Sequence, residues 1–212
     1  MIGIIDYGMG NLFSVSKALE RLEVPYFLSE DQEELKKADG LILPGVGSFK
    51  DAMDRLNATG LTGMIQEYTA AGKPLAGICL GMQLLFESSE ENGYSEGLKL
   101  LPGKVVRFPG EDEQGEKYKV PHMGWNRLEF INSSPILKNV EEGYVYFVHS
   151  YYAEPGDHDV VIARSFYDRE VPAVVGRDNV FGMQFHPEKS SSLGMELLRN
   201  FTTIASKGGE SQ

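Results

Sequence analysis

Short apolar runs alternate with amphipathic segments through the first 86 residues, and this pattern predicts an α/β fold. Each apolar run stops at a turn rich in glycine or polar residues, as expected of buried parallel strands. We expect strands at residues 2–6, 24–28, 40–43 and 75–78, and helices at residues 12–22, 31–37, 50–56, 62–71 and 80–86. Strands that alternate with helices in this way predict a mixed, mostly parallel sheet flanked by helices.

Helical periodicity nearly disappears in the second half, which is rich in strand-like segments. Residues 87–116 are polar and contain one clear strand, at 104–108. Further strands are expected at residues 125–131, 144–149, 160–165, 173–176 and 180–185. Residues 177–179 predict a hairpin turn between the last two, and a closing helix is expected at 193–204. We therefore expect one α/β domain over residues 1–205 and a polar tail at 206–212.

The composition is that of one globular domain, with 42% hydrophobic and 24% charged residues among 212. A formal net charge of -11 without a dense Lys/Arg stripe argues against nucleic acid or an anionic membrane as a partner. The single cysteine excludes an internal disulfide and a cysteine-based zinc site, and it favours an intracellular protein. No signal-like segment precedes the first strand, and no apolar run approaches the roughly 20 residues that span a bilayer. We expect a cytoplasmic location.

Cys79 stands between the strand at 75–78 and the helix that follows, with Gly77 and Gly81 on either side. A side chain at such a corner points out of the carboxyl edge of the sheet, and the glycines remove the Cβ atoms that would clash in the turn. The N-terminus of the next helix favours a thiolate there. Alternatively, Cys79 is a small buried hydrophobic residue or a redox sensor. It requires a base to act as a nucleophile.

The sequence His186-Pro187-Glu188, which follows the last predicted strand, provides a base. In an extended segment residues i and i+2 point to the same side, so that Glu188 can hydrogen-bond the imidazole. Pro187 biases His186 toward an extended conformation. The alternative is a capping glutamate beside a surface histidine. A cysteine at a strand-to-helix corner of the same chain favours a Cys-His-Glu triad instead.

Two glycine-rich turns lie at the carboxyl ends of predicted strands, where ligands bind in open α/β sheets. Residues 44–47, PGVG, either form a simple turn or leave the amide of Val46 free to face a ligand. Residues 7–11, YGMGN, suggest a dinucleotide-binding turn, but Phe13 stands where that fingerprint requires its third glycine. We therefore expect no dinucleotide cofactor.

The motifs at residues 44–47, 77–83 and 186–188 together resemble those of the class I (triad) glutamine amidotransferases, in order and spacing. Two more stretches, DYGMGN at 6–11 and PHMGWN at 121–126, resemble the glutaminase subunits of imidazole glycerol phosphate synthase, an enzyme of histidine biosynthesis. This resemblance covers nearly the whole chain. It implies a flavodoxin-like fold, glutamine as substrate, and neither a cofactor nor a metal.

The resemblance also implies a role for individual residues. Cys79 is the expected nucleophile and His186, oriented by Glu188, the expected base. The backbone N–H groups of Val46 and Leu80 are positioned in the sequence to stabilise an oxyanion. The expected substrate contacts are Gly47, Gln83, Ser150 and Tyr151. We also expect that the Gly45–Val46 peptide turns its amide away in the isolated subunit and toward the oxyanion when the partner is bound.

The resemblance further implies a heterodimer with a cyclase, a (β/α)8 barrel that uses the ammonia to make imidazole glycerol phosphate and aminoimidazole carboxamide ribotide. Residues expected at that interface are Asn11, Met123, Trp125, Tyr146 and Lys189. For Trp125 the alternative is a core aromatic residue; aromatic residues are also enriched at interfaces. Two other functions remain open: a glutaminase for anthranilate or pyridoxal phosphate synthase, and a non-enzymatic flavodoxin-like module.

Overall fold

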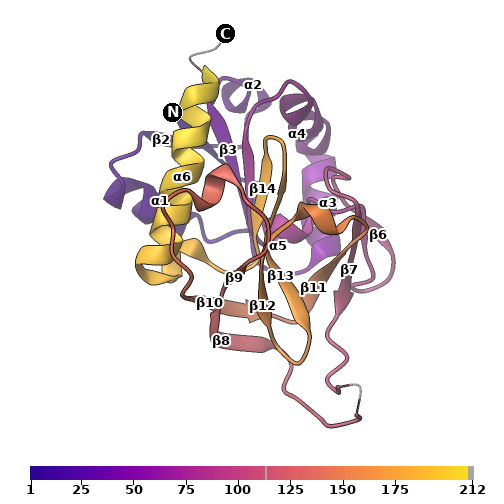
Figure 1. Ribbon diagram of the computed structural model, residues 1–212. Helices are drawn as coiled ribbons and strands as arrows, with labels where there is room; N and C mark the ends of the chain where they lie inside the picture. The colour runs from indigo at the N-terminus through magenta and orange to yellow at the C-terminus, as the bar shows by residue number, and fades with distance from the viewer. Residues whose placement is uncertain (113, 210–212) are drawn as a thin grey trace.

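The computed structural model describes residues 1–112 and 114–209. Within them, an eight-stranded sheet with the order β2-β1-β3-β4-β14-β13-β12-β9 forms the centre of the molecule (Figure 1). The pairs from β2 to β14 are parallel, and the pairs from β14 to β9 are antiparallel. The predicted α/β fold, a mixed and mostly parallel sheet flanked by helices with a strand-rich second half, is confirmed.

The parallel part alternates strands and helices. Its strands are β1 (Ile2–Ile5), β2 (Tyr26–Ser29), β3 (Gly40–Gly45), β4 (Leu75–Cys79) and β14 (Val180–Met183). The helices are α1 (Leu12–Arg21), α2 (Gln32–Leu35), α3 (Phe49–Ala58), α4 (Leu61–Ala70), α5 (Leu80–Gln83) and α6 (Ser191–Gly209). Asn11, Asp31 and Ser48 cap α1, α2 and α3, because their side chains accept from the third N–H that follows.

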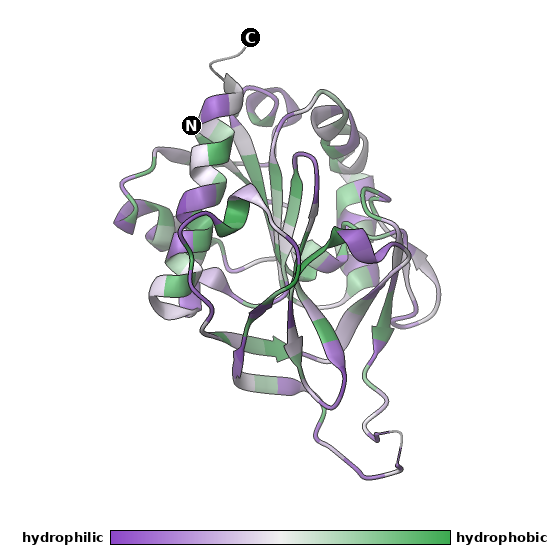
Figure 2. Ribbon diagram, in the orientation of Figure 1, coloured by the Kyte–Doolittle hydropathy of each residue, from purple (hydrophilic) through white to green (hydrophobic). Residues whose placement is uncertain are grey.

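Two apolar layers cover the sheet, which explains why its strands are apolar on both faces. Helices α1 and α6 pack on one face, and α2, α3 and α4 on the other (Figure 1). The central strands are largely green in the hydropathy colouring of Figure 2, and purple is concentrated on outer helix faces and loops. Among the described residues, no helix combines the length and the apolar character needed to cross a membrane.

The strand-rich half extends the central sheet and adds two smaller ones. Strands β9 (Glu129–Phe130), β12 (Val161–Phe166) and β13 (Glu170–Arg177) extend the central sheet. The smaller sheets contain β5 (Ser88–Ser89), β6 (Ser95–Glu96), β7 (Gly103–Arg107), β8 (His122–Arg127), β10 (Tyr144–His149) and β11 (Tyr151–Pro155). The described residues also form the 3-10 turns η1 (Pro135–Leu137), η2 (His158–Val160) and η3 (Pro187–Lys189). The predicted hairpin is confirmed, since Arg177 pairs with Val180.

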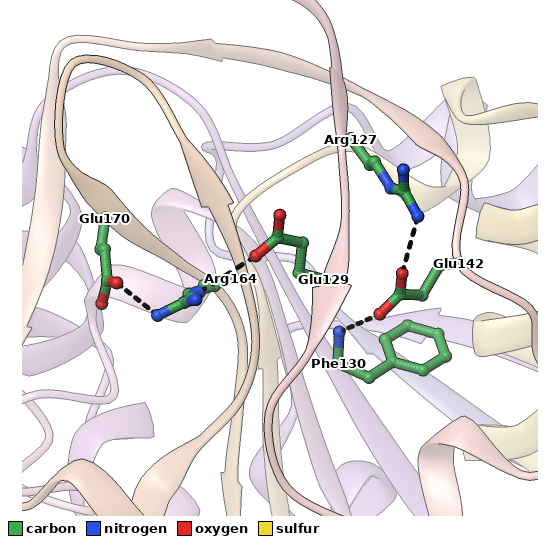
Figure 3. A network of polar contacts seen from close by, with 6 residues as sticks. All are labelled: Arg127, Glu129, Phe130, Glu142, Arg164 and Glu170. Carbon is green, nitrogen blue, oxygen red and sulfur yellow. Dashed lines mark hydrogen bonds and ion pairs between the residues drawn. The ribbon is translucent and has the colours of Figure 1, made fainter.

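Exposed ion pairs join the outer strands of the central sheet (Figure 3). Arg164 on β12 pairs with Glu129 on β9 and with Glu170 on β13. Glu142 pairs with Arg127 and also accepts the backbone N–H of Phe130 at 2.8 Å. Exposed pairs of this kind contribute about 0 to 1 kcal/mol each, so they align the edge strands more than they stabilise the fold.

Several expectations about elements were wrong in part. The helix expected at 80–86 ends at Gln83 because the following carbonyls bind another segment: Leu84 O accepts from Leu98 N at 2.8 Å, and the carbonyls of residues 85 and 86 also bind residues 99–101. The strand expected at 125–131 is split between two sheets, since Leu128 N donates to the Gly143 carbonyl at the break. Residues 87–116 contain β5 and β6 besides β7, and β11 was not expected. Helix α6 continues to Gly209, through the first residues of the expected tail, and residues 210–212 lie outside the described part.

Candidate active site

A cavity of about 400 Å³ lies at the carboxyl ends of β3 and β4. Its walls come from both halves of the chain. The residues that line it are Val46, Gly47, Cys79, Leu80, Gln83, Glu91, Pro121, Val148, His149, Ser150, Tyr151 and His186. Except for Glu188, every residue proposed from the sequence for catalysis, oxyanion binding or substrate binding lines this one cavity, which we call the site cavity.

Cys79 is the last residue of β4, pairs with Gly45 across the sheet and is 8% exposed. Its backbone is in a region that side chains rarely adopt, with φ 55° and ψ -112°. The turn is tight: a Cβ at Gly77 would lie 2.4 Å from the Gly81 carbonyl oxygen, and a Cβ at Gly81 would lie 1.9 Å from that of Leu43. Helix α5 behind the sulfur has a single turn, so the helix dipole expected to favour a thiolate is weaker than a full helix would give.

His186 lies against Cys79 and is held from behind by Glu188. The ring Nδ1 is 2.9 Å from Glu188 Oε1, and the side chains are 5% and 1% exposed. Since Nδ1–H donates to the carboxylate, Nε2 is the ring nitrogen left for the thiol. The two residues face each other across a 3-10 turn, because Pro187 begins η3, and not along an extended strand as the i, i+2 pattern suggested.

Burial of the imidazole opposes its protonation, but the hydrogen bonds and charges of Cys79 and Glu188 outweigh burial and raise the pKa of His186 to about 9. The carboxylate stabilises the imidazolium through the 2.9 Å bond. Its second oxygen, Oε2, is buried without a hydrogen-bond partner. The hydrogen bond to His186 thus orients this carboxylate, and the pKa of about 9 keeps the ring protonated near neutral pH.

The loop after β3 forms a second wall of the site cavity through Val46 and Gly47. The hydroxyl of Tyr7, two residues beyond β1, donates to the Pro44 carbonyl at 2.8 Å and so fixes the start of this loop. Burial, and then the nearby Cys79, raise the pKa of Tyr7 far above its ordinary value, so the hydroxyl remains a donor. Gly47 has φ 97°, a left-handed conformation that glycine adopts readily.

The polar end of the site cavity is built around Gln83, which is 4% exposed and therefore not a solvated helix residue. Its Nε2 donates to the Tyr151 carbonyl at 3.0 Å and to Gln184 Oε1 at 3.1 Å. Gln184 Nε2 in turn points at Cys79 Sγ, 4.0 Å away. The carbonyl of Ser150 accepts from Phe108 N at 3.1 Å, which fixes the strand that carries this wall.

Glu91 is the most important residue that the sequence did not reveal. Its Oε2 accepts the N–H of Phe49 at 2.8 Å, and its side chain brings a carboxylate to the site cavity. Burial raises the pKa of Glu91, the N–H of Phe49 lowers it, and Asp51 raises it. Glu91 stands in a polar stretch among other acids, so no sequence signal distinguished it. The cavity is also lined by three residues that were not expected there, Pro121, Val148 and His149.

The residues expected to face a partner lie around the same end of the molecule. Met123 and Trp125 project from β8 with 61% and 53% exposure, so Trp125 is not a core residue. Tyr146 on β10 pairs with Trp125, their rings being 6.0 Å apart, and its carbonyl accepts the N–H of His186. Lys189 is exposed on η3, which contacts α1, and Asn11 caps that helix. Among the described residues, no group of three or more His, Cys, Asp or Glu side chains is suited to hold a metal ion.

The chain matches the glutamine amidotransferase class-I family over residues 3–205 and belongs to that family. It is 68% identical over 209 residues to the imidazole glycerol phosphate synthase subunit HisH of Geobacillus kaustophilus (strain HTA426), covering 99% of each chain. The HisH subunit of Bacillus subtilis (strain 168) is 62% identical over 207 residues, with 98% of each chain covered. A crystal structure of a glutamine amidotransferase superposes with a TM-score of 0.76 over 97% of this chain and 98% of the other at 21% identity, and so has the same fold. The family predicted from the motifs is confirmed.

Proposed function

We propose that this protein is the glutaminase subunit of an imidazole glycerol phosphate synthase, which hydrolyses glutamine and passes the ammonia to a cyclase subunit. The alignment of Cys79 and His186 at the wall of the site cavity, with Glu188 behind His186, carries the chemistry. The choice of synthase rests on the 68% and 62% identity to HisH subunits over nearly the whole chain. That identity favours this synthase over anthranilate or pyridoxal phosphate synthase and over a non-enzymatic module. Its place of action is then the cytoplasm.

In the first half-reaction, His186 holds the proton of the Cys79 thiol, as its pKa of about 9 requires near neutral pH, and the thiolate attacks the side-chain amide carbon of glutamine. Glu188 holds Nδ1–H of the ring and stabilises the imidazolium. The carbonyl oxygen becomes an oxyanion, and the backbone N–H groups of Leu80 and Val46 are its proposed donors. His186 then protonates the amide nitrogen, the carbon–nitrogen bond breaks, and ammonia leaves a glutamyl thioester on Cys79.

In the second half-reaction, His186 takes a proton from water, which attacks the carbonyl carbon of the thioester. The same oxyanion donors stabilise the second tetrahedral intermediate. When it collapses, the carbon–sulfur bond breaks, the Cys79 thiolate leaves beside the protonated His186 as at the start of the cycle, and glutamate is released. Glutamine and water are consumed, and glutamate and ammonia are formed.

The polar end of the site cavity supplies what the backbone end of glutamine requires. Both N–H groups of the Gln83 amide are committed to protein acceptors, so the atom that it offers a ligand is its carbonyl oxygen. This oxygen and the carboxylate of Glu91 are suited to the α-ammonium group. Backbone groups of Gly47, Ser150 and Tyr151 at the wall are assigned to the α-carboxylate.

The exposed apolar residues near the site cavity suggest where the cyclase docks. Ammonia that escapes into neutral water becomes protonated and is no longer a nucleophile, so the partner must receive it directly. Met123 and Trp125 are large apolar side chains that remain exposed, which is typical of interaction surfaces. We propose that these two, with Tyr146, Lys189 and Asn11, form the surface that meets the cyclase.

The decisive test compares the wild-type chain with the Cys79→Ala variant, both assembled with a cyclase subunit and its nucleotide substrate. With glutamine the variant should make no product, whereas with free ammonium salts it should make product at the wild-type rate. Loss of the ammonia-dependent reaction would show that Cys79 acts structurally, and glutamine-dependent product from the variant would remove it from the mechanism. Wild-type chain without the cyclase should hydrolyse glutamine only feebly.

A further inference from the structure

Two buried histidines outside the triad connect the exposed strand β8 to the site cavity. His122 is the first residue of β8 and His149 the last residue of β10, and they pair across the sheet. Their exposures are 2% and 6%. His122 Nδ1 lies 2.9 Å from His149 Nε2. Neither ring takes part in the proposed chemistry, although His149 lines the site cavity.

The Tyr151 carbonyl fixes the direction of the hydrogen bonds that His122 and His149 make. His149 Nδ1 is 2.7 Å from the carbonyl oxygen of Tyr151, which only accepts, so Nδ1 of His149 carries the proton. In a neutral ring Nε2 is then an acceptor, and His122 must donate to it from Nδ1. His122 Nε2 accepts in turn from Asn126 Nδ2 at 3.4 Å. Both rings are therefore Nδ1–H tautomers.

The surroundings hold both rings neutral and fixed. Burial lowers the pKa of His122 to about 4. Burial also lowers the pKa of His149, which is about 3, although its bond to Tyr151 acts in the opposite direction. The ring of His122 is stacked between Phe147 and Tyr167, with centroid distances of 4.5 and 4.1 Å. A ring clamped on both faces cannot rotate freely, so it holds its donor on His149.

The chain of hydrogen bonds continues from Tyr151 to the catalytic residues. The Tyr151 carbonyl accepts from His149 and also from Gln83 Nε2. The remaining N–H of Gln83 donates to Gln184, whose own amide nitrogen points at Cys79 Sγ. The orientation of the Gln83 amide, and with it the acceptor offered to the substrate, therefore depends on a carbonyl that His149 holds.

We infer that His122 and His149 are positioning residues that orient the Tyr151 carbonyl and the Gln83 amide for glutamine, and that they couple this orientation to strand β8. The strand carries the exposed Met123 and Trp125, so a displacement of β8 by a partner reaches the glutamine site through the two rings. This inference rests on the proposed glutaminase function, because glutamine is the ligand that Gln83 orients.

The first test uses the wild-type chain and does not depend on its activity. A long-range ¹H–¹⁵N correlation spectrum of histidine-labelled protein near pH 7 reports which ring nitrogen carries the proton in each histidine. We expect the Nδ1–H tautomer for both His122 and His149. Their signals are assigned by their loss in the His122 and His149 variants. An Nε2–H tautomer in either ring breaks the chain of donors and overturns the inference.

The second test separates the hydrogen bond from aromatic packing in the Cys79→Ala background, where glutamine is not consumed. His122→Phe keeps the stacked ring and removes the donor, whereas His122→Asn places an amide nitrogen near the Nδ1 position and removes the stacking. Calorimetric titration with L-glutamine, with the cyclase subunit present, should give a Kd raised about 5- to 30-fold in the Phe variant, the effect of one lost hydrogen bond. The Asn variant should stay within about 3-fold of the background.

The exposed His158 provides the matched control, because His158→Phe makes the same substitution outside this group and should not change the Kd. Unchanged affinity in His122→Phe overturns the inference, and with a weakened Asn variant it would assign His122 to packing alone. Equal weakening in both variants also overturns it, because the amide donor of the Asn variant would then not restore the affinity. If His122→Phe does not fold, the Asn variant and the tautomers still decide. Absence of glutamine binding in the Cys79→Ala background itself would contradict the proposed function, while the tautomers would remain as the test of the histidine pair.

Discussion

The backbone of Cys79, with φ 55° and ψ -112°, is unfavourable for any residue with a side chain. Such strain is of order 1–3 kcal/mol and is retained where a reactive group must be displayed. We therefore expect Cys79→Gly to be more stable than Cys79→Ala by about 1 kcal/mol, although glycine normally destabilises folded chains. Urea unfolding of both variants measures the difference. An alanine variant at least as stable as the glycine variant would show that this turn is unstrained.

Gly45 illustrates how the structure changes an expectation about a loop. From the sequence, Gly45→Ala is expected to restrict rotation of the Gly45–Val46 peptide and leave glutamine binding intact. In the structure a Cβ there would lie 2.7 Å from Gly81 N and 2.9 Å from Leu80 Cβ, against the turn that carries Cys79, the proposed nucleophile. The substitution therefore disturbs the site directly and cannot isolate the rotation.

We accordingly predict that Gly45→Ala lowers the free energy of unfolding by about 2 kcal/mol or more, as overpacking does. Gly63 is the matched control: it is exposed on α4, and a Cβ there would meet nothing within 4 Å. Gly63→Ala should be stabilising by roughly 0.5–1 kcal/mol. The denaturant midpoint should fall in Gly45→Ala and rise in Gly63→Ala. An unchanged midpoint in Gly45→Ala would mean that α5 moves away easily.

The chemically distinctive residues of the site could be predicted from the sequence, and the ordinary ones could not. Cys79, Gln83 and His186 stand in motifs whose spacing has a mechanical reason, and the structure brings them to one cavity. Glu91 and His149 reach the same cavity from a polar loop and from the end of an edge strand. Nothing local marks such residues, because their positions depend on contacts with distant segments.

At the scale of elements, long periodic segments were predicted well and short ones poorly. Helices α1, α3 and α4 and the buried parallel strands follow from hydrophobic periodicity alone. Strands β5 and β6 are two residues long and exist only through their partners. Strand β11 follows β10 with only Ser150 between them, so no turn signal separates the two. Helix α5 ends early because the carbonyls of residues 84–86, which follow it, bind residues 98–101, a tertiary effect.

The turn η3 makes a prediction about the triad. Glu188 Oε1 fixes the His186 ring across this turn at 2.9 Å, with the carboxylate almost fully buried. Glu188→Gln keeps a group that can hydrogen-bond but removes the charge that stabilises the imidazolium. We expect kcat for glutamine hydrolysis to fall severely, by about 10² or more, while KM changes little. Steady-state kinetics of the assembled synthase test this, and near wild-type kcat would exclude Glu188 from the triad.

At the scale of the whole molecule, the site exists only where the two halves of the chain meet. Strand β14 lies beside β4, with Met183 opposite Ile78, and this register carries the following segment to Cys79. The sequence predicted the parallel half and the strand-rich half separately, and the pairing of β14 with β4 is what joins them. The motifs predicted that His186 acts on Cys79, but no hydrophobic pattern in the sequence predicted which strands pair to bring them together.

Stability should depend on pH because three buried histidines respond in different directions. The pKa of His122 and of His149 is lowered by burial to about 4 and about 3, so each is neutral when folded and charged in the unfolded chain below about 6.5. For His186, burial opposes protonation, but Cys79 and Glu188 raise its pKa to about 9. Its contribution is complete below pH 6.5, where both states are protonated, and is lost as pH rises toward 9.

The free energy of unfolding should therefore be highest near pH 6.5 as far as these histidines determine it, and should fall on both sides. Between pH 6.5 and 4 the unfolded chain binds more protons than the folded one, and His122 alone accounts for roughly 3 kcal/mol of the loss. Urea unfolding of the wild type and of His122→Phe from pH 4.5 to 9 measures the contribution of His122 to the free energy of unfolding. The contribution of the carboxylates is the same in both proteins and cancels in the comparison. The variant should have a shallower acid limb and an unchanged alkaline limb. Parallel curves for the two proteins below pH 6.5 would show that His122 is charged in the folded state, contrary to its place between Phe147 and Tyr167.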